Sequence, residues 1–236
     1  GTTAEQTVTL ITAGSIAISS IDTIVGTAAG SDTVTFLGSG SLSISAVESL
    51  LGTTAEQTVT LITSGSIAIS SIDTIVGTAA GSDTVTFLGS GALSISAVES
   101  LLGTTAEQTV TLITSGSIAI SSIDTIVGTA AGSDTVTFLG SGALSISAVE
   151  SLLGTSDEQT VTLITSGSIA ISSIDTIVGT AAGSDTVTFL GSGALSISAV
   201  ESLLGTSAEQ TVTLITSGSI AISSIDTIVG TSAGSD

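Results

Sequence analysis

Apolar and polar residues alternate in short runs along the whole chain. In Gln6-Thr7-Val8-Thr9-Leu10 and in Ser15-Ile16-Ala17-Ile18-Ser19, aliphatic residues take every second position. A period of two places these side chains on one face of a strand and the hydroxyl side chains on the other. Glycines such as Gly14, Gly26 and Gly40 separate the runs and mark corners. The pattern predicts an all-β protein built from short strands.

One segment also has features of a helix. Ser45-Ala46-Val47-Glu48 has the spacing of a helical capping box, and Gly52 is placed to end a short helix. The matching segment earlier in the chain, residues 20–25, is rich in β-branched residues and is a poor helix former. Because the two segments correspond, we predict a strand in both.

The alternation belongs to a tandem repeat. The run that begins at Gly1 returns at Gly52 and Gly103, and as close variants at Gly154 and Gly205, which gives a period of 51 residues. The repeats are residues 1–51, 52–102, 103–153, 154–204 and the partial copy 205–236. Each repeat divides into two similar halves, 1–25 and 26–51 in the first copy, which align when Gly30 is treated as an insertion.

A repeat too short to bury its own apolar face is typical of a solenoid. We therefore expect a parallel β-solenoid (β-helix) that is a single continuous structure over residues 1–236, right-handed by the crossover rule. One turn would take a half-repeat of about 25 residues and three strands, so that the 51-residue repeat makes a double turn. The core would contain Val8, Leu10, Ile16, Ile18, Ile21 and Ile24, with Phe36 stacked in the same column as Leu10.

The composition restricts the possible functions. The chain of 236 residues has no Lys, Arg, His, Pro, Cys, Met, Trp or Tyr, and its 20 Asp and Glu give a net charge of −20. Such a chain repels phosphate backbones and anionic lipids, so we expect no nucleic-acid partner. Its longest apolar runs, such as Ile16-Ala17-Ile18, are too short for membrane insertion. The absence of Met predicts an internal segment of a longer chain.

Two sets of acidic residues recur along the repeats. If a half-repeat were one turn, the first set would stack at ~4.8 Å, and neighbouring carboxylates would repel by about 1 kcal/mol in water. Calcium could bridge them, or they could form a solvated edge that limits aggregation. The first set includes Asp22, Glu48, Asp73 and Glu99 and continues to Asp226; the second set is Asp32, Asp83, Asp134, Asp185 and Asp236.

The second set carries a family resemblance. The run Gly30-Ser31-Asp32-Thr33-Val34-Thr35 resembles the second part of the nonapeptide GGxGxDxUx of the repeats-in-toxin (hemolysin-type) proteins, which binds calcium in a parallel β-roll. The runs 21–27 and 47–53 are similar to repeats of large secreted bacterial surface proteins and adhesins. The resemblance implies a secreted protein at the cell surface and calcium ligands at Asp32 and its equivalents. Gln6 stands at the ligand position in the other half-repeat.

Threonine pairs form a third recurring set. If they face outward from equivalent strands, they form a regular hydroxyl array that is similar to the ice-binding face of antifreeze β-solenoids. The alternative is that threonine is a favourable polar residue for an exposed strand. The pairs are Thr7 and Thr9, Thr33 and Thr35, Thr58 and Thr60, and Thr84 and Thr86, and they continue to Thr211 and Thr213.

These observations favour a structural function. An active site is a local departure from regularity, whereas here each half-repeat copies the one before it and offers no cationic or imidazole partner, so we expect no enzyme and no cofactor apart from the calcium alternative. We expect a segment of an extracellular bacterial fibre, biofilm matrix protein or adhesin shaft, whose partner is itself, stacked head-to-tail through uncapped solenoid ends. The alternatives are an ice-binding solenoid and a calcium-stabilised repeat domain, with ice or other cell-surface components as partners.

Overall fold

The computed structural model describes residues 5–231, and it shows strands joined by short corners. Among these residues no helix is long and apolar enough to cross a membrane. The first repeat contains β1 (Thr7–Thr9), β2 (Ser15–Ile18), β3 (Thr23–Val25), β4 (Thr33–Phe36), β5 (Gly40–Ser45) and β6 (Ser49–Leu51). The second contains β7 (Gln57–Leu61), β8 (Ser66–Ser70), β9 (Thr74–Val76), β10 (Thr84–Phe87), β11 (Gly91–Ser96) and β12 (Ser100–Leu102).

The same six strands recur in the remaining copies. The third repeat contains β13 (Gln108–Leu112), β14 (Ser117–Ser121), β15 (Thr125–Val127), β16 (Thr135–Phe138), β17 (Gly142–Ser147) and β18 (Ser151–Leu153). The fourth contains β19 (Gln159–Leu163), β20 (Ser168–Ser172), β21 (Thr176–Val178), β22 (Thr186–Phe189), β23 (Gly193–Ser198) and β24 (Ser202–Leu204). The partial copy contains β25 (Gln210–Leu214), β26 (Ala221–Ser223) and β27 (Thr227–Val229). The acidic residue Asp236 lies outside the described residues.

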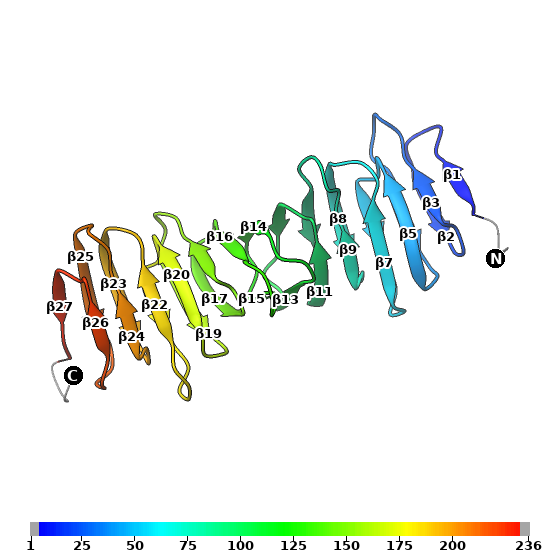
Figure 1. Ribbon diagram of the computed structural model, residues 1–236. Helices are drawn as coiled ribbons and strands as arrows, with labels where there is room; N and C mark the ends of the chain where they lie inside the picture. Colours follow the sequence, from blue (N-terminus) through cyan, green and yellow to red (C-terminus); the bar gives the residue numbers. More distant parts are fainter. Residues whose placement is uncertain (1–4, 232–236) are drawn as a thin grey trace. The chain divides into compact units, whose positions relative to one another are not determined.

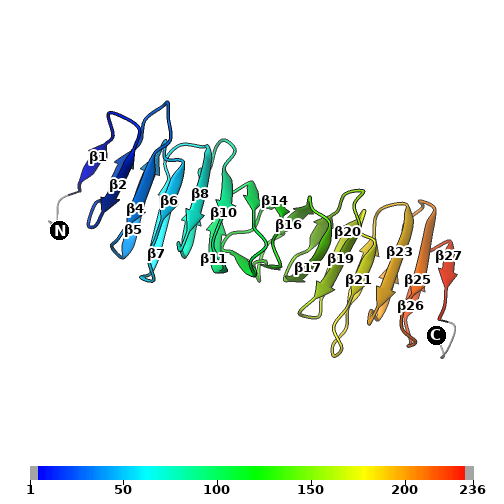
Figure 2. The ribbon, with the colours of Figure 1, turned by 180° about the vertical axis from the view of Figure 1, so that it is seen from behind.

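The chain divides into two compact units, Gly1–Thr114 and Ser115–Asp236, and each unit is a parallel β-solenoid with two sheets. In each unit the odd-numbered strands form one sheet, here sheet A, and the even-numbered strands form the other, sheet B. Figure 1, with Figure 2 from behind, shows the strands of each unit stacked side by side. Neighbouring strands pair in parallel, as β5 does with β7 and β8 with β10. The structure therefore confirms an all-β solenoid.

The length of a turn differs from the prediction of about 25 residues. Each turn contains one strand of sheet A and one of sheet B, so it takes about 17 residues and not three strands. Three turns, and not two, make up a 51-residue repeat: β1, β3 and β5 precede β7 in sheet A, and β7 begins the next copy. The turn of three strands, and the triangular cross-section that it would give, are therefore wrong.

A screw relation between the half-repeats explains this difference. Each half-repeat does supply three strands, but three strands make one and a half turns of a two-sheet solenoid. Each half-repeat therefore begins on the sheet opposite to the one before it: Thr7–Thr9 lies in sheet A, whereas its counterpart Thr33–Phe36 lies in sheet B. Successive halves are related by half a rotation about the solenoid axis in addition to their rise along it.

The core lies between the two sheets. The inward positions predicted from the first repeat are buried in the second, where Val59, Leu61, Ile67, Ile72 and Ile75 are at most 7% exposed. The phenylalanines are also buried, but Phe36 lies in sheet B and pairs with Ile18, while Leu10 follows β1 of sheet A. The expected shared column of Phe36 and Leu10 is therefore wrong, because the two positions belong to opposite sheets.

The stacking register shifts along each unit. In sheet A, Thr7 pairs with Thr23, Thr23 with Ser43, and Ser43 with Thr60, whereas the true equivalent of Thr7 is Thr58. A column of stacked residues thus advances by two positions for every three turns. Side chains of one type consequently do not stack in an unbroken vertical row.

Along each edge of the solenoid, one corner in every three turns is a tight turn of three residues with a distinctive backbone conformation. These corners contain one non-glycine residue with positive φ, such as Ser71 at 55° in corner 71–73 and Ala97 at 51° in corner 97–99. The carbonyl oxygen of Ala97 lies directly against Gly77 of the preceding turn, where any Cβ atom would overlap it. Gly52 has the same relation to Ser71. These glycines are required because a neighbouring backbone occupies the space of a side chain.

Candidate functional site

The four described aspartates of the second acidic set, Asp32, Asp83, Asp134 and Asp185, are buried at corners between the sheets. Asp83 immediately precedes β10 and is 0% exposed. Its Oδ1 accepts a hydrogen bond from Gly65 N at 3.0 Å, and its Oδ2 accepts one from the Thr78 hydroxyl at 2.8 Å and another from Thr78 N. Gly65 belongs to the turn below. The carboxylate therefore connects two successive turns through backbone N–H groups.

Asp32, Asp134 and Asp185 have the same environment as Asp83. Each is 0% exposed and accepts hydrogen bonds from the equivalent glycine and threonine. The backbone N–H of Thr27 is the main cause that lowers the pKa of Asp32 below its ordinary value of 3.8. The Thr27 hydroxyl and Gly14 N act in the same direction, whereas burial of the carboxyl acts in the opposite one.

This pKa direction predicts how pH affects stability. Because the pKa of Asp32 is lower in the folded state, its charge stabilises the fold above the unfolded pKa, and this contribution is lost as the pH falls through the folded pKa. We expect wild type to melt above Asp32→Asn at neutral pH, and the difference to shrink below about pH 4. Melting curves of both proteins at a series of pH values test this; a difference that stays constant into acid would contradict it.

A glutamine takes the place of the aspartate in the other half-repeat. Gln57 is 1% exposed; its Nε2 donates to the carbonyl oxygen of Phe36 at 2.7 Å and to that of Gly38, and its Oε1 accepts from Thr53 N at 3.1 Å. The corner below Gln57 has three residues between its strands, whereas the corner below Asp83 has four, 62–65. The shorter corner directs carbonyl oxygens inward, and the side chain above it is a glutamine, which can donate hydrogen bonds. The longer corner directs an N–H group inward, and the side chain above it is an aspartate, which accepts one.

The first acidic set caps backbone groups at both edges. Glu48 Oε2 accepts from Asp32 N at 2.7 Å, and Asp73 Oδ2 accepts from Gln57 N at 2.8 Å. Asp22 precedes a strand of sheet A and Glu48 one of sheet B, so they lie on opposite edges. Asp22 and Asp73 share an edge but are three turns apart, or ~14 Å by strand spacing. The expected stack of Asp22, Glu48, Asp73 and Glu99 at ~4.8 Å is therefore wrong.

The residues that the sequence suggests as calcium ligands have other hydrogen-bond partners in the structure. Oxygens of Asp32, Asp83, Asp134 and Asp185 already accept N–H and O–H hydrogen bonds, and those of Asp22, Glu48, Asp73 and Glu99 cap backbone N–H groups. Within residues 5–231, no three acidic side chains come together in a group that could hold a metal ion. The carboxylates act here as internal hydrogen-bond acceptors.

The threonine pairs do not form one array. Thr7 and Thr9 of β1 and Thr58 and Thr60 of β7 lie in sheet A, whereas Thr33 and Thr35 of β4 and Thr84 and Thr86 of β10 lie in sheet B. Pairs in the same sheet are three turns apart, and Thr60 lies beside Ser43 and Val76. The expectation that all pairs face outward from equivalent strands is wrong, because the half-turn between half-repeats sends alternate pairs to opposite faces.

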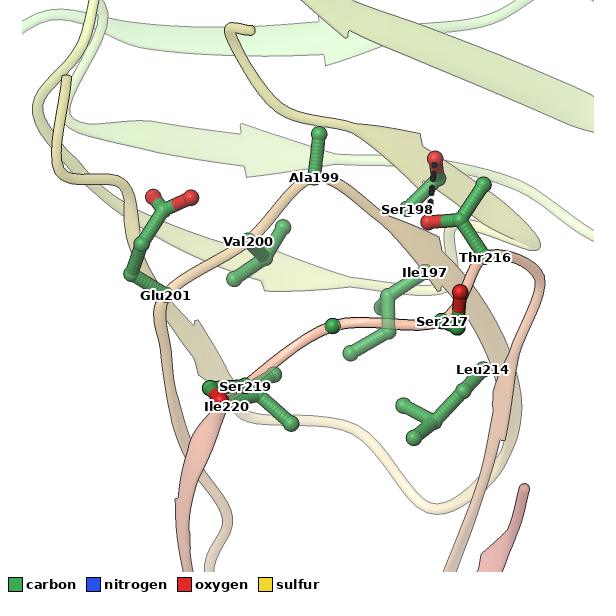
Figure 3. Close-up of a pocket in the computed structure, with 11 residues that line it drawn as sticks. Ile197, Ser198, Ala199, Val200, Glu201, Leu214, Thr216, Ser217, Ser219 and Ile220 are labelled. Atoms are coloured by element: carbon green, nitrogen blue, oxygen red, sulfur yellow. Dashed lines mark hydrogen bonds between the residues drawn. The ribbon is translucent and has the colours of Figure 1, made fainter. Parts of the chain in front are cut away.

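A small pocket recurs where a tight corner is followed by a wider one. Figure 3 shows it in the second unit, between 197–201 and 214–220, with Ser198 and Thr216 joined by a hydroxyl hydrogen bond of 3.2 Å. Its volume is about 240 Å³, and equivalent pockets of about 220 and 180 Å³ occur at 44–67 and 146–169. Because the pocket follows from the spacing of the corners, it recurs with the repeat and is not a specialised site.

The chain matches no family model, no curated protein and no solved structure.

Proposed function

We propose that this chain is a structural segment of an extracellular bacterial fibre, matrix protein or adhesin shaft. The supporting observation is that one hydrogen-bonding scheme recurs from repeat to repeat. The bond from Gly26 N to Ser45 O, at 2.8 Å, returns as Gly77 N to Ser96 O, Gly128 N to Ser147 O and Gly179 N to Ser198 O, each at 2.8 Å. Apolar residues, buried acceptors and corner glycines recur with the same period, as expected for a quasi-one-dimensional structural repeat.

Self-association along the axis is part of this proposal. In a parallel solenoid, the backbone N–H and C=O groups of each turn pair with those of the next turn, so a turn with no neighbour on one side leaves these groups unpaired. A second copy can supply that turn in a head-to-tail contact, and contacts of this kind generate open filaments. An extracellular location agrees with a composition that has no Lys or Arg for trypsin-like proteases and a net charge of −20 that opposes unspecific aggregation.

Electron microscopy of the purified chain tests the proposal. We expect filaments of chains joined end to end, with an axial spacing of ~4.8 Å, both with calcium and with EDTA. Separate particles that never join end to end in either buffer would contradict head-to-tail stacking. Filaments that form only with calcium would show that a metal ion, and not the repeat alone, determines assembly.

A further inference from the structure

The charges of this protein are confined to the edges of the solenoid. Every Asp and Glu among residues 5–231 lies in a corner, and none lies within a strand. The outward positions of both sheets therefore carry only uncharged side chains, for example Ser66, Ala68 and Ser70 on β8. Such a face can approach another one without burying an unpaired charge, which would be costly.

In each unit the outer face of sheet B also carries leucines at a regular interval. Leu51, Leu102, Leu153 and Leu204 end β6, β12, β18 and β24, and they are 46%, 42%, 40% and 44% exposed. Leu51 lies between Thr35 and Ser70 on the neighbouring strands. Two residues before Leu51 on the same strand, Ser49 pairs with Ala68. Each leucine is thus a large apolar side chain beside a small one, and the arrangement repeats every three turns, or ~14 Å.

Sheet A has a flatter version of the same face. The screw relation puts Val25 in the position of Leu51, between Thr9 and Ser45 on the neighbouring strands. Val76, Val127 and Val178 recur in the same way. Both faces place a threonine and a serine on either side of this aliphatic residue, but sheet B has Leu51 and Ala68 where sheet A has Val25 and Ser43.

We propose that the sheet B face binds the sheet B face of a second copy of this chain, with the leucines of each copy seated beside the small alanines of the other. A second copy carries leucines and alanines at the same ~14 Å spacing, so contacts made at one repeat recur at the next. Each unit offers roughly 500 Å² of this face by strand length and spacing, so a pair of units from two copies would bury about 1,000 Å² in total, which is the size of a weak protein–protein interface. Uncharged, closely interdigitated side chains between paired sheets are the basis of dry β-sheet interfaces.

The carboxylates at the edges oppose this pairing over a longer range. Salt screens repulsion between exposed charges, with a Debye length of about 8 Å at physiological ionic strength. Lateral pairing should therefore strengthen as salt increases. Binding of a basic partner to the acidic edges would show the opposite salt dependence.

Two matched variants of the full chain test the proposal. The first carries Leu51→Thr, Leu102→Thr, Leu153→Thr and Leu204→Thr, and the control carries Val25→Thr, Val76→Thr, Val127→Thr and Val178→Thr on the other face. Sedimentation and the cross-section from small-angle scattering measure lateral pairing, and circular dichroism confirms that each variant is folded. We expect pairing of wild type to be weakened at least about tenfold in the leucine variant and about twofold or less in the control.

Several results would overturn the proposal. Wild type that remains one solenoid thick at all salt concentrations, equal effects of the two variants, or unchanged pairing of the leucine variant would each do so. Wild type that stays single but binds lipid vesicles through the leucines would identify a membrane surface as the occupant instead. End-to-end filaments are scored separately by their length, so failure of lateral pairing leaves the proposed axial stacking untouched.

Discussion

Replacing Gly77 by alanine is expected to separate neighbouring turns of the first unit. The new Cβ atom would overlap the carbonyl oxygen of Ala97 in the following turn and lie 2.8 Å from Asp83 Oδ2. Backbone and a buried carboxylate cannot move aside, so we expect a loss of about 3 kcal/mol or more. Because a solenoid turn contacts only its neighbours, the damage should be local. Hydrogen exchange should show lost protection in β9 and β11.

Gly65→Ala is the matched control for this substitution. A Cβ atom at Gly65 meets nothing within 4 Å, and the N–H that donates to Asp83 is retained. We expect a change within about 1 kcal/mol in either direction, because the alanine also restricts the unfolded chain. Equal loss of protection in the two variants would show that the contact between Gly77 and Ala97 does not set the spacing of the turns.

The buried carboxylate gives the second large effect. In Asp83→Asn one oxygen becomes an NH₂ group, and because both oxygens of Asp83 accept N–H hydrogen bonds, either orientation of the amide places a donor against a donor. Leaving a buried donor unsatisfied costs roughly 1–3 kcal/mol, so we expect about 2 kcal/mol of destabilisation. Thermal melting measures the loss, and hydrogen exchange should locate it at β8 and β10.

Glu56→Gln separates this effect from the loss of a negative charge. Glu56 lies in an exposed corner of the same repeat, and its substitution removes one charge from a chain with a net charge of −20. We expect a change within about 0.5 kcal/mol. If this variant is destabilised as much as Asp83→Asn, the overall charge of the chain, and not the buried hydrogen bonds, would be the cause.

The strands and the core could be predicted from the sequence, but the closure of the turn could not. Alternation of aliphatic and hydroxyl residues identifies the inward side chains, such as Val59 and Ile75, because it depends only on the local chain. Three strands per half-repeat fit both one turn of a triangle and one and a half turns of a flattened solenoid. The two differ only in which strands pair, and that depends on contacts about 17 residues apart.

The roles of the candidate site residues depended on the same contacts. The recurrence of Asp32 is visible in the sequence, but its function follows from an N–H group that Gly14 of the neighbouring turn points toward it. Gln57 carries no sequence signal of burial, because its partners Phe36 and Gly38 come from the turn below. The positive φ of Ser71 and Ala97 is also unexpected, since that conformation favours glycine.

The half-rotation between half-repeats has a consequence for how such an array can change its length. Loss or gain of a whole 51-residue copy by recombination removes or adds three whole turns, so every later residue stays in the sheet to which it belonged. Loss of a single half-repeat would move every later strand to the other sheet, so that the leucines equivalent to Leu51 would then lie in sheet A and not in sheet B. Strand pairing would hardly change, but a buried glutamine would meet a corner that presents an N–H group in place of carbonyl oxygens, and the surface pattern would be broken in two. Recombination that preserves a continuous surface is therefore restricted to whole copies.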